Sequence, residues 1–138
     1  MQKLIISFFI LFFIFGCRQP PSPEQIRQAD YGIYPEKYKE LVTEYITANL
    51  IDPTSPIFSN WTGPEKGWYQ ELYSQNGKVY YGYKVCVYVN AKNRMGGYTG
   101  ASPFFVVINN NQVVYLDSAS SYKRGTIGEQ EAYRRCNF

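Results

Sequence analysis

The chain has 138 residues, with 14 basic and 11 acidic side chains, a formal net charge of +3 and no histidine. A charge this small does not favour nucleic-acid binding, which depends on clustered Lys and Arg. Without histidine the usual general base is missing, and Ser-His and Cys-His nucleophile pairs are impossible. We therefore expect neither catalysis nor a nucleic-acid partner. The carboxylate pairs that remain, Glu65 with Glu71 and Glu129 with Glu131, are expected to be solvated surface groups.

The N-terminus predicts a signal peptide over residues 1–16. Lys3 gives it a positive start, and residues 4–15 are apolar except for Ser7. A run of about 12 apolar residues is too short for a bilayer, which needs roughly 20, but it suits the apolar region of a secretory signal peptide. An ordinary signal peptide or an uncleaved anchor is the alternative to a lipoprotein signal.

The signal peptide ends in Ile14-Phe15-Gly16-Cys17, which resembles a bacterial lipobox, although Phe15 is bulkier than the usual residue before the glycine. The resemblance implies lipidation of Cys17 by palmitate-type acyl chains, and two or more such chains anchor a protein stably to a membrane. The next residue is Arg18, and not the Asp that signals retention in the inner membrane. We therefore expect the cell envelope as the location, with a lipid anchor in the outer membrane and the protein facing the periplasm.

Residues 17–33 predict an acylated cysteine followed by a Pro-rich tether. Pro20, Pro21 and Pro23 fall within four positions, and the segment has little apolar surface to bury. Proline stiffens such a segment towards polyproline II, at about 3 Å per residue, so we expect an extended spacer. The globular domain is then expected over residues 34–138.

An amphipathic helix is predicted from Pro35 to about Asn49. Proline is tolerated in the first turn, and Asp52-Pro53 would end the helix because proline disfavours helical geometry in the residue before it. Such a short helix is marginal alone, so we expect its apolar stripe to pack on a sheet. The side chains that recur at the spacing of one helix face are Tyr38, Leu41, Val42, Tyr45 and Ile46.

The strongest strand pattern runs from Lys78 to Asn90. Apolar and aromatic side chains alternate there at period two, which predicts a half-buried strand. Residues 69–73 predict a partner strand, joined to it by the Asn-Gly turn at 76–77. Residues 62–67, between two tryptophans, predict a loop.

A second hairpin is predicted after three glycines at 96–100, with strands over 103–108 and 112–116. The predicted fold class is therefore α+β. We expect an N-terminal amphipathic helix packed on an antiparallel sheet of about four strands, in two hairpins.

Two cysteines remain when Cys17 is assigned to lipid. A short helix predicted over 129–135 would bring Cys136 to Cys86, and two thiols in an oxidising compartment most often pair. A zinc site is the alternative, but four nitrogen or sulfur ligands are not available without histidine or a third free cysteine. We therefore expect a disulfide between Cys86 and Cys136, and no metal or cofactor.

Three segments, Asp52–Phe58, Cys86–Asn93 and Gly96–Gly100, follow a shared pattern. The pattern is Asp-Pro-x-Ser-Ala-x-Phe, then Cys-Gly-x-Val-Asn-Ala-Lys-Asn, then Gly-Gly-Tyr-x-Gly, with Pro56 and Val87 departing from it here. It resembles a group of small bacterial envelope and prophage-associated lipoproteins, over roughly residues 35–110. The resemblance implies an α+β domain and no particular activity.

The glycine-containing loop is the candidate binding site. It is not a P-loop, because its lysine precedes the glycines and a strand follows them. A purely structural tight turn, with two asparagines capping backbone groups, is the alternative to ligand binding. The candidate binding residues are Asn90, Lys92, Asn93, Arg94 and Tyr98.

These features point to a membrane-anchored, non-catalytic module that binds a protein partner in the envelope. An inhibitor of a cell-wall hydrolase is a narrower form of this hypothesis. The alternative is a glycan or peptidoglycan binder that stacks sugars on surface aromatics such as Trp61 and Trp68. Both hypotheses compete with the expectation that most aromatic rings fill the core.

Overall fold

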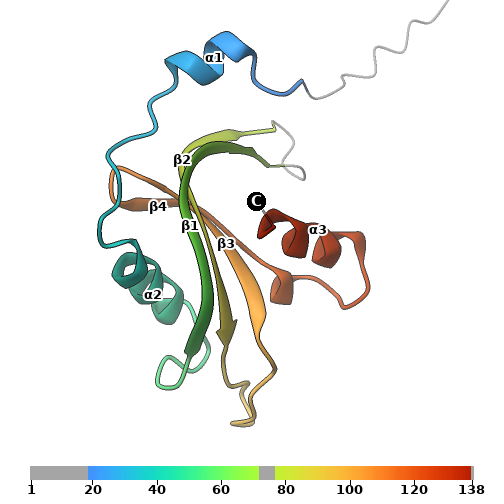
Figure 1. The fold of residues 1–138 in the computed structure, drawn as a ribbon. Helices are drawn as coiled ribbons and strands as arrows, with labels where there is room; N and C mark the ends of the chain where they lie inside the picture. The colour runs from blue at the N-terminus through green and yellow to red at the C-terminus, as the bar shows by residue number, and fades with distance from the viewer. Residues whose placement is uncertain (1–18, 72–76, 138) are drawn as a thin grey trace, which may run out of the picture.

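The structure, a computed structural model, describes residues 19–71 and 77–137. Four strands lie between an N-terminal pair of helices and a C-terminal helix (Figure 1). The elements are α1 (Pro23–Gln28), α2 (Tyr38–Ala48), β1 (Ile57–Gln70), β2 (Val79–Asn90), β3 (Ser102–Asn109), β4 (Gln112–Ser118), the 3-10 helix η1 (Ala119–Ser121) and α3 (Ile127–Arg135).

The strands form one antiparallel sheet in the order β1-β2-β3-β4. The predicted α+β class, with about four antiparallel strands, is confirmed. The two predicted hairpins are joined into a single meander, because β2 pairs with β3 from Tyr83–Ile108 to Val89–Ser102. The Asn76 half of the predicted Asn-Gly turn lies outside the described residues.

Both faces of the sheet are covered, because α2 and α3 lie on opposite sides of it (Figure 1). On one face, Val42 and Ile46 of α2 pack with Val85 and Val87 of β2. On the other, Cys86 is buried with side chains of β3 and the end of α3. The predicted half-buried strand is therefore buried on both faces at its centre, and its alternation separates two cores instead of core from solvent.

The predicted amphipathic helix forms, but it is not the first helix of the chain. It begins at Tyr38, whose amide donates to the carbonyl of the buried Pro35 at 3.1 Å. A shorter helix, α1, precedes it in the segment predicted to be an extended tether. The hydroxyl of Ser22 and the amide side chain of Gln25 form a capping box that accounts for this extra helix.

The end of the predicted tether is docked on the sheet. Asn109 Nδ2 donates to the Asp30 carbonyl at 2.9 Å, and Ile33 N donates to Asn110 Oδ1 at 3.2 Å. The Tyr31 ring meets the Tyr81 ring edge-on, with 5.7 Å between their centres. The prediction of an extended spacer is therefore wrong for residues 23–33, since helix capping and these contacts outweigh the stiffness that proline supplies.

The loop predicted over residues 62–67 is part of strand β1. Pairing with β2 shifts register between Ser59 and Thr62 and again between Thr62 and Glu65, then continues to Gln70. Bulges and edge strands are where proline is tolerated in a sheet, and β1 is an edge strand carrying Pro64. The turn-forming residues therefore interrupt the strand without ending it.

The predicted C-terminal helix and disulfide are both present. α3 carries Cys136 to Cys86, with the two Cα atoms 5.5 Å apart. Arg135, in the last turn of α3, forms an ion pair with Asp117 at the end of β4. The C-terminal segment is thus fixed to the sheet by one covalent and one ionic contact.

Candidate functional site

All three sequence segments with a shared pattern meet at one end of the sheet. Ile57, the first residue of β1, pairs with Asn90, the last residue of β2, at the end opposite the β1–β2 turn. The hydroxyl of Tyr98 donates to the Ser55 carbonyl at 3.2 Å. Residues 51–57 and 90–100 therefore form one surface, here called the distal surface, which includes all five predicted loop residues.

Side-chain hydrogen bonds hold the loop in a defined shape. Asn93 Oδ1 accepts from Met95 N at 2.9 Å and from Gly97 N at 3.1 Å, and Asn90 Oδ1 accepts from Gly100 N at 3.0 Å. Gly96 and Gly100 have φ of 81° and 96°, which other residues adopt at a cost. The turn geometry expected of the two asparagines is therefore present, and it presents the intervening side chains outward.

The other half of the distal surface is a turn organised by Asp52. Its carboxylate accepts from Thr54 N at 2.9 Å and from Ser55 Oγ at 3.4 Å. Hydrogen bonds from the side chain and backbone of Thr54 lower the pKa of Asp52, and the charge of Lys92 acts in the same direction. Lys92 Nζ also lies 5.3 Å from the centre of the Tyr98 ring, so it links the turn to the loop.

Four large apolar or aromatic side chains are exposed on the distal surface. Met95, at the tip of the loop, is 94% exposed, and the neighbouring Arg94 is also exposed. The exposed fractions of the others are 68% for Ile51, 52% for Ile57 and 47% for Tyr98. Because the loop beneath them is hydrogen-bonded, this apolar surface is presented in a fixed arrangement.

Sequence reasoning missed part of this surface. Asp52 and Ser55 belong to a patterned segment, but the partner strand is predicted only from residue 69, so the sequence does not place this segment beside the loop. Met95 and Ile51 carry no signal either, since an apolar residue in a loop has no periodicity from which its exposure can be judged.

Trp61 and Trp68 are, with several tyrosines, the aromatic residues predicted to stack on sugars. Trp61 packs on Phe58 and Tyr38, with ring centres 6.1 and 6.0 Å apart, and joins the α2 core. Trp68 is partly buried. Trp61 therefore serves mainly as a packing residue of the domain.

The predicted carboxylate pairs do not come together as pairs. Glu65 lies 3.5 Å from Lys84 Nζ, and Glu131 lies 2.7 Å from Arg134 Nη1. Glu129 accepts from the Gly125 amide near the start of α3. These three carboxylates are thus each satisfied by a basic or amide group.

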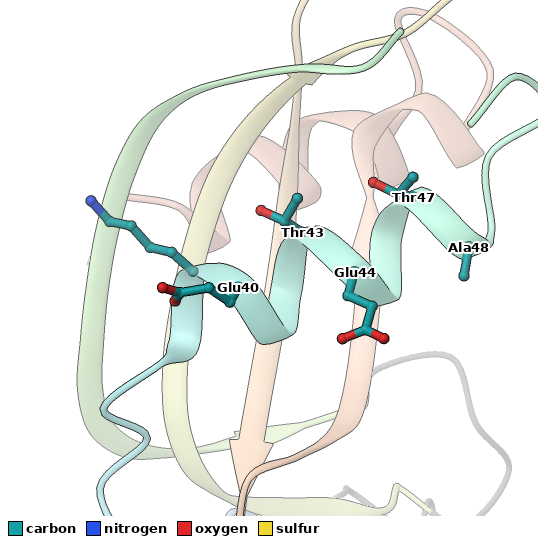
Figure 2. A pocket seen from close by; sticks show the side chains of 6 residues that line it. Glu40, Thr43, Glu44, Thr47 and Ala48 are labelled. Carbon is teal, nitrogen blue, oxygen red and sulfur yellow. The ribbon is translucent and has the colours of Figure 1, made fainter. Parts of the chain in front are cut away.

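A shallow depression follows the outer face of α2 (Figure 2). Its side chains all come from this one helix, so it is the solvent-facing side of α2. The lining residues are Lys39, Glu40, Thr43, Glu44, Thr47 and Ala48.

A more enclosed polar cleft, of about 350 Å³, adjoins the distal surface. One wall is residues 99–102, which lead from the loop into β3. The other wall comes from η1 and α3 and includes Arg124, Glu129 and the partly exposed ring of Tyr133. This cleft combines hydroxyl, charged and aromatic groups on one side of the candidate loop.

Within residues 19–71 and 77–137, no helix has the length and apolarity needed to cross a bilayer, and no three His, Cys, Asp or Glu side chains gather as a metal site would require. The predicted signal peptide and Cys17 lie outside these ranges. No protein-family model, curated protein or solved structure matches the chain.

Proposed function

We propose that this protein is a lipid-anchored, non-catalytic module of the bacterial envelope that binds a protein partner through its distal surface. It would belong with the small envelope and prophage-associated lipoproteins that its sequence pattern resembles. The observation that carries the proposal is the exposure of Met95, Tyr98, Ile51 and Ile57 on a loop and turn fixed by hydrogen bonds. Large apolar side chains exposed on a hydrogen-bonded loop and turn are typical of a protein-binding site.

Fixed geometry favours binding because little conformational entropy is lost when the partner arrives. Asn93 and Asn90 already hold the loop backbone, and Tyr98 is tied to the turn through Ser55. Tyrosine adds a rigid, amphipathic contact with few rotatable bonds. Met95 can adapt its shape to a partner's pocket, since its side chain is unbranched and flexible.

The charges on the distal surface define the chemistry of the partner. Arg94 and Lys92 border the apolar side chains, so the complementary surface is an apolar pocket edged by carboxylates. Glycoside hydrolases hold two carboxylates in their clefts, and a loop tip carrying Arg94 and Met95 is complementary to such a cleft. An inhibitor of a cell-wall hydrolase is therefore the narrower form of this proposal.

A glycan-binding function is the second candidate, and the polar cleft beside the loop supports it. Its hydroxyl groups, Arg124 and Glu129 offer donors and acceptors, and Tyr133 offers a ring on which a sugar could stack. The cleft replaces Trp61 as the site to test, because Trp61 is packed against Tyr38 and Phe58.

The protein partner is tested by site-specific photocrosslinking in native membranes. A photoreactive residue at position 95 should capture one envelope protein, while the same residue at position 127, where Ile127 is also exposed but lies on α3, should not. Tyr98→Ala should weaken capture about tenfold or more, as loss of an interface hot spot does. Tyr98→Phe, which keeps the ring, should weaken it much less.

Identical adducts from positions 95 and 127 would contradict the protein-binding proposal. Retention on purified peptidoglycan, lost in Arg124→Ala and kept in Tyr98→Ala, would establish the glycan alternative in its place.

The lipid anchor is tested separately by metabolic labelling with radioactive palmitate. Label should enter the wild-type chain and be absent from Cys17→Ala. An unlabelled wild-type chain, or one recovered free in the cytosol, would disprove the anchor without bearing on the distal surface.

A further inference from the structure

A second cavity, of about 190 Å³, lies on the α3 face of the sheet, against the last turn of α3. Its lining contains three cationic side chains and no acidic one. The lining residues are Tyr69, Lys84, Phe105, Arg134, Arg135 and Asn137. Two of the cations have ion-pair partners outside the lining, since Glu65 contacts Lys84 and Glu131 contacts Arg134.

Arg135 is the buried cation of this cavity, with its side chain only 8% exposed. One guanidinium nitrogen, Nη1, pairs with Asp117, whose carboxylate also accepts from the Tyr122 hydroxyl at 2.9 Å. The guanidinium carbon lies 5.1 Å from the centre of the Tyr69 ring. The second nitrogen, Nη2, is buried and has no hydrogen-bond partner among the described residues. Buried donors are normally satisfied by protein, water or a bound ion, so this nitrogen indicates a missing acceptor.

The Tyr69 hydroxyl supplies a second donor beside Arg135. Tyr115 donates its own proton to the Tyr69 oxygen at 3.4 Å, which leaves the Tyr69 proton available to another acceptor. The cavity thus presents neutral and cationic donors with their protons in place.

We propose that this cavity binds a carboxylate carried on a short apolar stem, such as the terminus of a small peptide or an acylated amino acid. The carboxylate accepts from the Tyr69 hydroxyl and, once the buried guanidinium turns towards it, from Arg135 Nη2, while Lys84 and Arg134 add attractive charge. The rings of Tyr69 and Phe105 contact the apolar stem. Phosphate fits less well, because its oxygens need donors on several sides and two of these walls are aromatic.

The test uses the whole folded domain with its disulfide intact, titrated with N-acetylalanine and followed by amide chemical shifts in NMR spectra. Saturable shifts should appear at residues lining the cavity, and N-acetylalanine amide, which lacks the charge, should bind at least tenfold more weakly. Arg134→Ala and Tyr69→Phe should each weaken binding about threefold to tenfold, as expected for one charge or one hydrogen bond. Lys123→Ala, which removes an exposed cation outside both this cavity and the polar cleft, is the matched control and should leave binding unchanged.

Equal, non-saturating shifts with N-acetylalanine, its amide and inorganic phosphate would overturn the proposal. So would equal losses in Arg134→Ala and Lys123→Ala, which would indicate attraction to net charge alone. A crystal structure grown with N-acetylalanine in which only water meets Arg135 Nη2 would also refute it.

Discussion

The helices on the two faces of the sheet are held in place by different kinds of contact. On the α2 face, branched aliphatic side chains do the packing, with Val42, Ile46, Val85 and Val87 each at most 1% exposed. On the α3 face, the buried residues of the helix itself are only Gly128 and Ala132. Two such small residues bury little apolar area, so hydrophobic packing of the helix contributes little there.

The α3 face compensates with covalent, ionic and aromatic contacts. The Cys86–Cys136 disulfide and the Arg135–Asp117 ion pair fix the end of α3. Under them lies a cluster of rings with centres 4.6 to 6.3 Å apart, formed by Tyr69, Tyr80, Phe105 and Tyr115. An amphipathic stripe is therefore sufficient to pack one helix on the sheet, whereas a polar helix on the same sheet needs specific covalent and ionic contacts.

Removing the disulfide should have the largest effect and should act on the α3 face first. Cys86→Ala combined with Cys136→Ala opens a loop of 50 residues, and we expect a loss of about 4 kcal/mol in the free energy of unfolding. Chemical denaturation of the double variant against the oxidised wild type measures this loss. Hydrogen exchange should show α3 amides losing protection while α2 amides keep theirs. Simultaneous loss of protection in both helices would show that the two faces are not independent.

Truncation on the α2 face should have the next largest effect. Ile46→Ala removes a fully packed side chain, for which large-to-small core substitutions lose about 2 to 5 kcal/mol. Ile127→Ala is the matched control on α3, where the side chain is 72% exposed, and it should change stability by less than about 0.5 kcal/mol. Thermal unfolding of both variants compares them. Equal losses would mean that α3 also depends on apolar packing.

The two faces also differ in how far the sequence predicts them. The α2 stripe and the alternation of β2 are periodic signals, so the sheet and the helix on it follow from hydrophobic pattern alone. The disulfide follows from having two cysteines left to pair. The Arg135–Asp117 pair could not be predicted, because its partners are 18 residues apart on elements whose relative placement no local pattern encodes.

The sequence predictions that were wrong or incomplete share one physical cause, which is that contacts between distant segments outweighed local preferences. Turn-forming Gly63 and Pro64 favoured a loop within β1, yet pairing with β2 across two bulges outweighed that local preference. The candidate loop was located through its glycines and asparagines. Its apolar tip at Met95 and its contact with Ser55 depend on how the ends of β1 and β2 meet, which appears only in the folded arrangement.

The smallest expected effect concerns pH and again distinguishes the α3 face. Burial raises the pKa of Tyr115 above its ordinary value of about 10, so the folded state keeps its proton where the unfolded state loses it. Above pH 10 the unfolded state therefore binds fewer protons, and the free energy of unfolding falls as pH rises. Tyr115→Phe removes this contribution, so its stability should decline less than that of the wild type between pH 10 and 12.

Tyr133→Phe is the matched control, because its ring also belongs to the α3 side but is 39% exposed. Denaturation midpoints measured from pH 8 to 12 should fall in parallel for Tyr133→Phe and the wild type. The curve for Tyr115→Phe should be flatter over the same range. If all three curves fall in parallel, the loss of stability at alkaline pH arises from other groups, such as lysines, and not from Tyr115. A flatter curve for Tyr115→Phe alone would place the pH-sensitive contacts on the face held by rings and charges, where aliphatic packing is thinnest.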